Sequence, residues 1–261
     1  MSNYKLSVCL PGHRTHLWEN LYNSIGRSVG DEYSWELVMV GPNYPSSFFD
    51  DKLNFKFLRD HGTPSRCFQL STLLAEGELV TWASDDGYYT DLSLNSCIRM
   101  HNNLGKKDIV IARHVEGTDH SGKPHAGGDS FWKAHFHPTL RLPGIPQDFM
   151  IILNGMMNLK FYRELGGVDC RYENYNVNLH DFAFRAQRAG TQMHFSKMTV
   201  LNCDWNPNQG DHVPVADAHN EHDMPLFVNE MLKDQSDRIK IDLFNWAEQP
   251  TIWKRRFGDL K

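Results

Sequence analysis

Short apolar runs that end in turn residues recur through the first hundred residues of the chain. The run at 5–10 stops at Pro11-Gly12, and the run at 36–40 stops at Gly41-Pro42. Runs of this length bounded by Gly and Pro are typical of β-strands, and an unbroken apolar run indicates a strand buried on both faces. The pattern therefore predicts strands at 5–10, 36–40, 55–58 and 79–82.

Segments with helical spacing separate these strands. Leu17, Leu21 and Ile25 recur every four residues and form one face of an amphipathic helix. A second helix is predicted between Ser65, which can cap its start, and Gly77, which can end it. Strands that alternate with helices predict an α/β fold, with a mostly parallel sheet flanked by helices in a single domain.

The second half of the chain has a weaker pattern. It predicts strands at 108–112 and 150–153, a short helix at 160–165 closed by Gly166-Gly167, and a helix at 179–188 that begins near Asn178. Polar stretches at 114–147 and 203–225 are too long for simple connections and are expected to be functional loops. We expect one domain, 1–261, with a nucleotide-binding half at 1–105, a second half at 106–225 and a helical tail at 226–261.

Composition narrows the class of protein. The 261 residues include 40% hydrophobic residues and carry a net charge of −5, which is typical of a globular protein and does not favour nucleic acid as a partner. No apolar stretch approaches the roughly 20 residues of a membrane helix, and the N-terminus is too polar for a signal peptide. The five cysteines form no CxxC pair, which indicates reduced thiols. We expect a soluble, cytoplasmic protein.

The candidate chemistry follows the predicted strands. Ligands of parallel sheets bind beyond the carboxyl ends of the strands, so the segments 11–14, 41–43 and 85–86 should converge on one cleft. The adjacent carboxylates of Asp85 and Asp86 repel each other unless a cation neutralises them, and hard oxygen ligands suit Mg²⁺ or Mn²⁺ with a bound diphosphate. The alternative interpretation is an exposed Asp-Gly turn.

Two further groups could take part. Asp181, at the expected start of a helix, could be a general base facing an acceptor hydroxyl, with His180 and Glu173 as rivals, or it could only cap the helix. The 203–225 stretch is rich in His and Asp, and His212 could complete the coordination of a metal held by Asp86. Loop histidines are also commonly solvated.

Several of these segments occur in an order that resembles the family 2-type glycosyltransferases, which have a GT-A fold. The residues 7–14 (SVCLPGHR) resemble the first strand and nucleotide-binding turn of that family, 36–40 (ELVMV) the second strand, and 79–86 (LVTWASDD) the strand that ends in a DxD-type metal motif. Asn154-Gly155, 166–169 (GGVD) and 181–190 (DFAFRAQRAG) resemble the acceptor-side segment. The resemblance covers roughly 5–195.

This resemblance implies the transfer of a sugar from a nucleotide-diphosphate donor to an acceptor hydroxyl with a divalent metal, Mn²⁺ or Mg²⁺. We expect inversion, and the alternative is another base or retention of configuration. The metal would be held by Asp86, with Asp85 and His212, and Asp181 would be the catalytic base. Asn154 and Trp205 are candidates for acceptor contacts. The implied nucleotide-binding residues are Pro11, Gly12, His13, Arg14, Asn43, Arg66, Asp85 and Asp86.

The sequence departs from the family pattern at three acids. Gly41, Ala83 and Leu179 stand where the family usually has an acidic residue, although Asn43 could replace the first. These departures leave open a GT-A-like module that has lost catalysis and binds a glycan or a partner protein. A sugar nucleotidyltransferase is another alternative, but 11–14 (PGHR) is a poor match to the Gly-rich basic loop such an enzyme needs.

Overall fold

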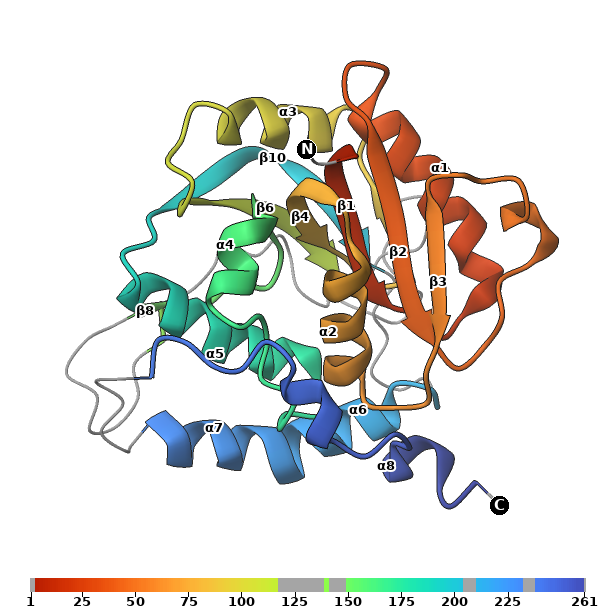
Figure 1. The fold of residues 1–261 in the computed structure, drawn as a ribbon, viewed down its shortest axis with the longest axis vertical. Helices are drawn as coiled ribbons and strands as arrows, with labels where there is room; N and C mark the ends of the chain where they lie inside the picture. Colours follow the sequence, from red (N-terminus) through yellow and green to blue (C-terminus); the bar gives the residue numbers. More distant parts are fainter. Residues whose placement is uncertain (1–2, 117–138, 141–148, 204–209, 232–237, 261) are drawn as a thin grey trace.

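The protein forms an eight-stranded sheet with helices on both faces (Figure 1). The computed structural model describes residues 3–116, 139–140, 149–203, 210–231 and 238–260. The strand order is β3-β2-β1-β4-β9-β6-β10-β5. The bounds are β1 Tyr4–Pro11, β2 Trp35–Gly41, β3 Phe55–Arg59, β4 Gly77–Trp82, β5 Gly87–Tyr89, β6 Ile109–Glu116, β9 Gly155–Asn158 and β10 Met193–Cys203; β7 Thr139–Leu140 and β8 Phe149–Met150 form a separate pair.

The sheet is mixed, with a parallel part built by the first hundred residues. Strands β3, β2, β1 and β4 are parallel to one another, whereas β9 runs antiparallel between β4 and β6. β6 and β10 are parallel, and β5 closes the edge in the antiparallel sense. The predicted α/β sheet flanked by helices is confirmed, and its parallel character holds for β1–β4. The two predicted halves of the chain contribute to one sheet.

Helices cover the two faces of this sheet. They are α1 Trp18–Val29, α2 Pro64–Leu74, α3 Ser93–His101, α4 Leu159–Glu164, α5 Tyr175–Arg188, α6 Val213–Ala218, α7 Met224–Met231 and α8 Lys254–Phe257. Alternate residues of each central strand point to opposite faces. Val8 and Met39 pack in the core on the α1 side, whereas Cys9 and Val38 pack against Phe68 of α2. Both faces of β1 and β2 are therefore buried, as the continuous apolar run at 36–40 predicts for β2.

The structure corrects several local predictions. Thr63, not Ser65, caps α2: its hydroxyl accepts a hydrogen bond from Arg66 N, and Pro64 occupies the first turn. The run at 150–153 is not one strand, because β8 ends at Met150 and β9 begins at Gly155. Helix α5 begins at Tyr175, capped by Asn174, so Asp181 lies in its middle instead of at its start.

The predicted loop at 203–225 also contains helix. Pro214 lies in the first turn of α6, and a π-helical segment at His219–Asp223 joins α6 to α7. The predicted helical tail is helical only in part. After α7, the described residues contain a short 3₁₀ turn, Asn245–Glu248, and α8. The backbone N–H of Ile241, before the 3₁₀ turn, donates to Leu165 O, and that of Trp253, before α8, donates to His61 O. The described residues of the tail therefore do not form a continuous helix.

A close contact between two glycines joins the ends of β1 and β2. A Cβ atom on Gly41 would lie 1.7 Å from the backbone oxygen of Gly12, and one on Gly12 would lie 2.6 Å from Met39 Cε. Gly12 N also donates a hydrogen bond to Val40 O. No side chain fits at position 41 in this backbone, which explains physically why an acidic residue is absent there.

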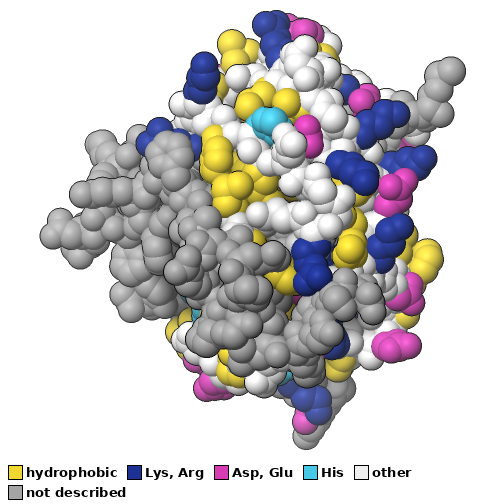
Figure 2. Space-filling model, turned by 90° about the vertical axis from the view of Figure 1, so that its left-hand side faces the viewer, with side chains coloured by type: hydrophobic (Ala, Val, Ile, Leu, Met, Phe, Trp, Pro, Cys, Tyr) yellow, Lys and Arg dark blue, Asp and Glu magenta, His cyan; other side chains and the backbone are white. Residues whose placement is uncertain are grey.

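Three further features concern the class of protein that the sequence predicts, namely the cysteines, the length of the helices and the charges on the surface. All five cysteines are buried and free. Within the described ranges, none of the helices has the length and apolar character needed to cross a bilayer. On the visible face in Figure 2, Lys and Arg side chains lie among Asp and Glu side chains and do not form one continuous basic patch.

Candidate functional site

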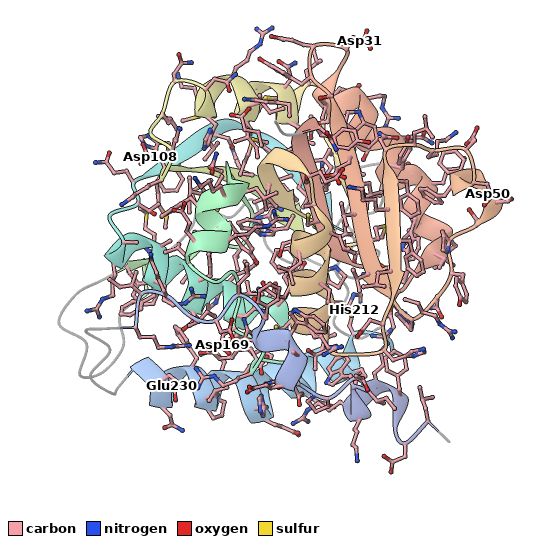
Figure 3. All side chains as sticks on the ribbon, viewed as in Figure 1. Asp31, Asp50, Asp108, Asp169, His212 and Glu230 are labelled. Atoms are coloured by element: carbon pink, nitrogen blue, oxygen red, sulfur yellow. The ribbon has the colours of Figure 1, made fainter. Side chains whose placement is uncertain are left out.

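A cleft lies beyond the carboxyl ends of the parallel strands. Its walls come from the turn after β1, the end of β2, the Asp85-Asp86 turn after β4, the start of α5, the start of α6 and the region of α8. Figure 3 shows His212, the residue that precedes α6, on this side of the sheet. The cleft contains these sequence-predicted site residues: Pro11, Gly12, His13, Arg14, Asp85, Asp86, Asn154 and His212.

Asp85 is fixed at the floor of the cleft. Its Oδ2 atom accepts hydrogen bonds from the backbone N–H groups of His13 and Arg14, both 2.6 Å away, and its Oδ1 atom accepts one from Arg14 Nε at 2.9 Å. Burial alone would raise the pKa of Asp85, but the charge of Arg14 and these hydrogen bonds lower it to about 2. Both oxygens are engaged, so Asp85 holds the turn after β1 in place.

Asp86 has a different environment. Its side chain is 3% exposed, its Oδ2 atom lies 3.2 Å from Arg14 Nη1 and 3.7 Å from His212 Nε2, and its Oδ1 atom is buried. Within the described residues, Oδ1 has no hydrogen-bond partner. A buried carboxylate oxygen without a partner costs free energy unless a ligand or a cation satisfies it.

These residues can hold a divalent cation in part. A carboxylate oxygen and an imidazole are suitable donors for Mn²⁺, and such ions commonly take only one or two protein ligands when a diphosphate supplies others. The described residues contain no cluster of three His, Cys, Asp or Glu side chains that could hold a metal by themselves. A cation would therefore need a bound diphosphate for its other ligands, and Asp86 and His212, which both contact Arg14 Nη1 here, would be its protein ligands.

Arg14 connects the acidic groups of the cleft. In addition to the bonds between Arg14 and Asp85, the Nη1 atom of Arg14 lies 2.9 Å from His212 Nε2 and 3.4 Å from Asp211 Oδ2. Burial would lower the pKa of Arg14, but Asp85 and Asp86 outweigh this effect and raise it. The guanidinium therefore stays charged and compensates the Asp85-Asp86 pair.

Of the two predicted Asn residues, Asn154 lines the cleft and Asn43 lies beside its wall. The Asn154 side chain is buried and donates a hydrogen bond from Nδ2 to Trp82 O at 2.6 Å. Asn43 is exposed, and its Nδ2 donates to His13 O at 2.8 Å. Asn43 thus supports the nucleotide-binding turn that the sequence predicts, although the cleft wall itself is formed by its neighbours Gly41 and Pro42.

Arg66 does not reach the cleft. Its guanidinium forms an ion pair with Asp60 at 3.0 Å and donates to Trp246 O at 2.6 Å. It therefore attaches the C-terminal segment to α2. The sequence could not reveal this role, because the partner Trp246 is 180 residues away.

Asp181 also lies outside the cleft. It is fully buried, its Oδ2 atom pairs with Arg185 Nε at 2.9 Å, and its Oδ1 atom pairs with Arg238 Nη1 at 2.6 Å. Arg185 in turn donates to Leu165 O at 2.8 Å. This network joins α5 to the end of α4 and to the segment after α7. Trp205, the other predicted acceptor contact, lies outside the described residues.

Several residues of the cleft were not predicted from the sequence. Asn174, Tyr175 and Asn176 come from the start of α5, and Trp253, Arg256 and Phe257 from the C-terminal segment. The Asn residues carried a signal in principle, because Asn commonly caps helices, and Asn174 caps α5. The C-terminal residues had no local signal, since only the tertiary fold brings them to the strand ends.

Comparison with solved structures identifies the architecture. The chain aligns with residues 1–349 of TarS from S. aureus at a TM-score of 0.59 and 16% identity, covering 93% of this chain and 71% of TarS 1–349. The chain has a GT-A fold. The same TarS fragment has been solved with UDP and with UDP-GlcNAc. GalNAc-T7, solved with UDP, GalNAc and Mn²⁺, aligns at a TM-score of 0.56 and 12% identity, over 94% of this chain and 56% of GalNAc-T7.

Sequence comparison gives no corresponding match. No protein-family pattern matches the chain, and no curated protein matches it. At 12–16% identity the structural similarity extends to the fold alone. Evidence for the function therefore comes from the residues of the cleft.

Proposed function

We propose that this protein is a glycosyltransferase that transfers a sugar from a nucleoside-diphosphate donor to an acceptor hydroxyl. The observation that carries this proposal is the Asp85-Asp86 pair, buried at the end of β4 in a cleft at the carboxyl ends of the parallel strands. In open α/β sheets, ligands bind at this end of the sheet. The GT-A fold supports the proposal, because TarS and GalNAc-T7 have been solved with UDP.

The charges of the cleft support a divalent cation. Its described walls carry three carboxylates, those of Asp85, Asp86 and Asp211, and two guanidinium groups, those of Arg14 and Arg256. With neutral histidines the net charge is −1, which would repel a diphosphate. A divalent cation at Asp86 and His212 would reverse this sign and would stabilise the diphosphate as a leaving group.

The residues of the chain have distinct roles in this proposal. Pro11, Gly12 and His13 form the wall beside the nucleotide, and only glycine fits in the middle of this turn because a Cβ atom on Gly12 would meet the side chains of Met39 and Trp18. Asp85 keeps that turn in position through the backbone N–H groups of His13 and Arg14. Arg14 stays charged and faces the diphosphate. Asn154 lies at the acceptor side, with its Nδ2 already bonded to Trp82 O.

The stereochemical course depends on a base. Inversion requires a carboxylate or imidazole beside the acceptor hydroxyl. The contacts of Asp181 with Arg185 and Arg238 support a structural role for this residue. Both of its oxygens form ion pairs, and the residue does not line the cleft. Inversion therefore stays a prediction without an assigned base, and the anomeric configuration of the product tests it directly.

The test is nucleotide binding followed by turnover. The melting temperature is measured with UDP, GDP, CDP, ADP and dTDP, each with and without Mn²⁺, because a ligand of the native state raises it. We expect UDP to be bound, and UDP-sugars are then assayed for transfer by release of UDP. A folded protein that binds no nucleotide would overturn the proposal.

The second candidate function is a glycan- or partner-binding module of GT-A fold. The buried position of Leu179, where the family usually has an acid, favours it. It predicts that glycan binding survives the substitution Asp86→Asn and that UDP-sugars are not turned over. If the protein is the proposed enzyme, the wild type turns over a UDP-sugar and Asp86→Asn loses this turnover.

A further inference from the structure

The C-terminal segment around α8 forms a wall of the cleft, although it begins about 50 residues after the end of β10, the last strand in the sequence. Trp253 is buried, its backbone N–H donates to His61 O at 2.8 Å, and its indole N–H donates to Glu173 Oε2 at 3.2 Å. Ile252 forms a parallel bridge with His61. These contacts fix the approach to α8 against the loop that precedes α2.

This attachment places Arg256 and Phe257 in the cleft. The Phe257 ring packs near His61 and His13, with centroid distances of 5.6 and 6.2 Å. The Nη1 atom of Arg256 donates to the backbone oxygen of Asp211 at 2.9 Å. Arg256 is therefore held beside the Asp211-His212 pair. It comes from the C-terminal part of the chain, whereas Arg14 comes from the N-terminal part.

The two guanidinium groups of the cleft differ in their compensation. Arg14 forms ion pairs with Asp85, Asp86 and Asp211. Arg256 is partly buried, and among the described residues its guanidinium is bonded to a neutral carbonyl and forms no ion pair. Accordingly, burial lowers the pKa of Arg256, whereas the pKa of Arg14 is raised.

A partly desolvated cation with no carboxylate in ion-pair contact costs free energy, although the charges of Asp211 and Asp85 reduce this cost, and an anion entering the cleft would recover it. We infer that Arg256 is an anion-binding residue of the cleft and that it binds the diphosphate of the donor. The planar fork of the guanidinium suits two phosphate oxygens at once. The assignment of the anion as a nucleotide diphosphate rests on the proposed function.

The neighbouring basic residues provide matched controls. Lys254 lies on the same helix, is exposed and pairs with Asp259 at 3.1 Å. Arg255 points the other way and pairs with Glu173 and Glu221. Lys254→Gln removes the same unit of charge from α8 without touching the cleft, so it separates a local contact from a general loss of positive charge.

The experiment measures the affinity of the full chain for UDP, uridine and inorganic pyrophosphate by calorimetry, with Mn²⁺ present and absent. We expect Arg256→Gln to weaken UDP and pyrophosphate at least tenfold and to leave uridine unchanged. Lys254→Gln should change all three by less than about twofold, and Arg256→Lys should recover part of the loss. The melting temperature of ligand-free Arg256→Gln should equal or exceed that of the wild type, because an uncompensated charge is removed.

The outcomes separate this inference from the proposed function. If the wild type binds UDP and Arg256→Gln binds it equally well, the role of Arg256 is overturned while the proposed function stands. If the wild type binds pyrophosphate through Arg256 but no nucleoside diphosphate, the anion site stands and the proposed function fails. If it binds neither anion, both are overturned. A lower melting temperature with unchanged anion affinity would assign Arg256 a purely structural role.

Discussion

Arg14 holds Asp85 with its backbone and its side chain at once. The backbone N–H of Arg14 donates to Oδ2 of Asp85, while Nε and Nη2 of the same residue donate to Oδ1. This contact joins the turn after β1 to the turn after β4, which are 71 residues apart in the sequence. The two strand ends that form the centre of the cleft are therefore fixed relative to each other before any ligand binds.

The first prediction concerns stability in acid. The folded-state pKa of Asp85, about 2, lies below its ordinary value of 3.8, so its contribution is present above pH 4 and is lost as the pH falls through 2. A shift of this size corresponds to about 2 kcal/mol. Urea unfolding at pH 6 and pH 2 should show that Asp85→Asn is destabilised at pH 6 and that its difference from the wild type shrinks by about this amount at pH 2. Asp51→Asn, whose carboxylate is exposed, is the control and should show little change.

The second prediction concerns the metal. Asp86→Asn removes the charge of the proposed cation ligand, so Mn²⁺ should no longer strengthen UDP binding. We expect UDP affinity in the presence of Mn²⁺ to fall at least tenfold, roughly the scale of altered metal sites. UDP affinity without Mn²⁺ should change by less than about threefold. Equal Mn²⁺ dependence in wild type and variant would show that Asp86 does not hold the cation.

The third prediction concerns Asp181. Asp181→Asn leaves the buried Arg185 without its negative partner, which typically costs about 3–5 kcal/mol, and removes one of the two carboxylate partners of Arg238. Urea unfolding should show this loss, whereas Asp91→Asn, which breaks the exposed pair with Arg27, should cost less than about 1 kcal/mol. At a temperature where the variant is folded, UDP affinity and turnover should be close to the wild type. Loss of turnover at normal stability would instead support Asp181 as the base.

The fourth prediction concerns the contact between the ends of β1 and β2. Gly41→Ala places a Cβ atom 1.7 Å from Gly12 O, so the two strand ends must separate. We expect a loss of about 3 kcal/mol or more in the free energy of unfolding, together with weaker UDP binding. Gly210→Ala is the matched control, because none of the described residues lies within 4 Å of a Cβ there. Equal stability of the two variants would contradict the contact.

Local pattern was sufficient for the parallel part of the sheet. The apolar runs at 36–40 and 79–82 became β2 and β4 within two residues, because strands buried on both faces must be apolar along their whole length. Because these strands are parallel, Pro11 to Arg14 and Asp85-Asp86 were predicted to lie at one edge of the sheet, and the structure brings them together. Short elements such as β5 and β9 were missed, since runs of three or four residues have no measurable period.

What the sequence determined by itself was the order of strands and helices around β1–β4 and the polar residues at their carboxyl ends, because both depend on neighbours a few positions apart. The tertiary structure alone decided what each charge does. It paired Asp181 with Arg238 and Arg66 with Asp60 and Trp246, outside the cleft, and it brought Arg256 into the cleft. Charges act through distance and burial, and the partners that set both lie up to 198 residues apart in the chain.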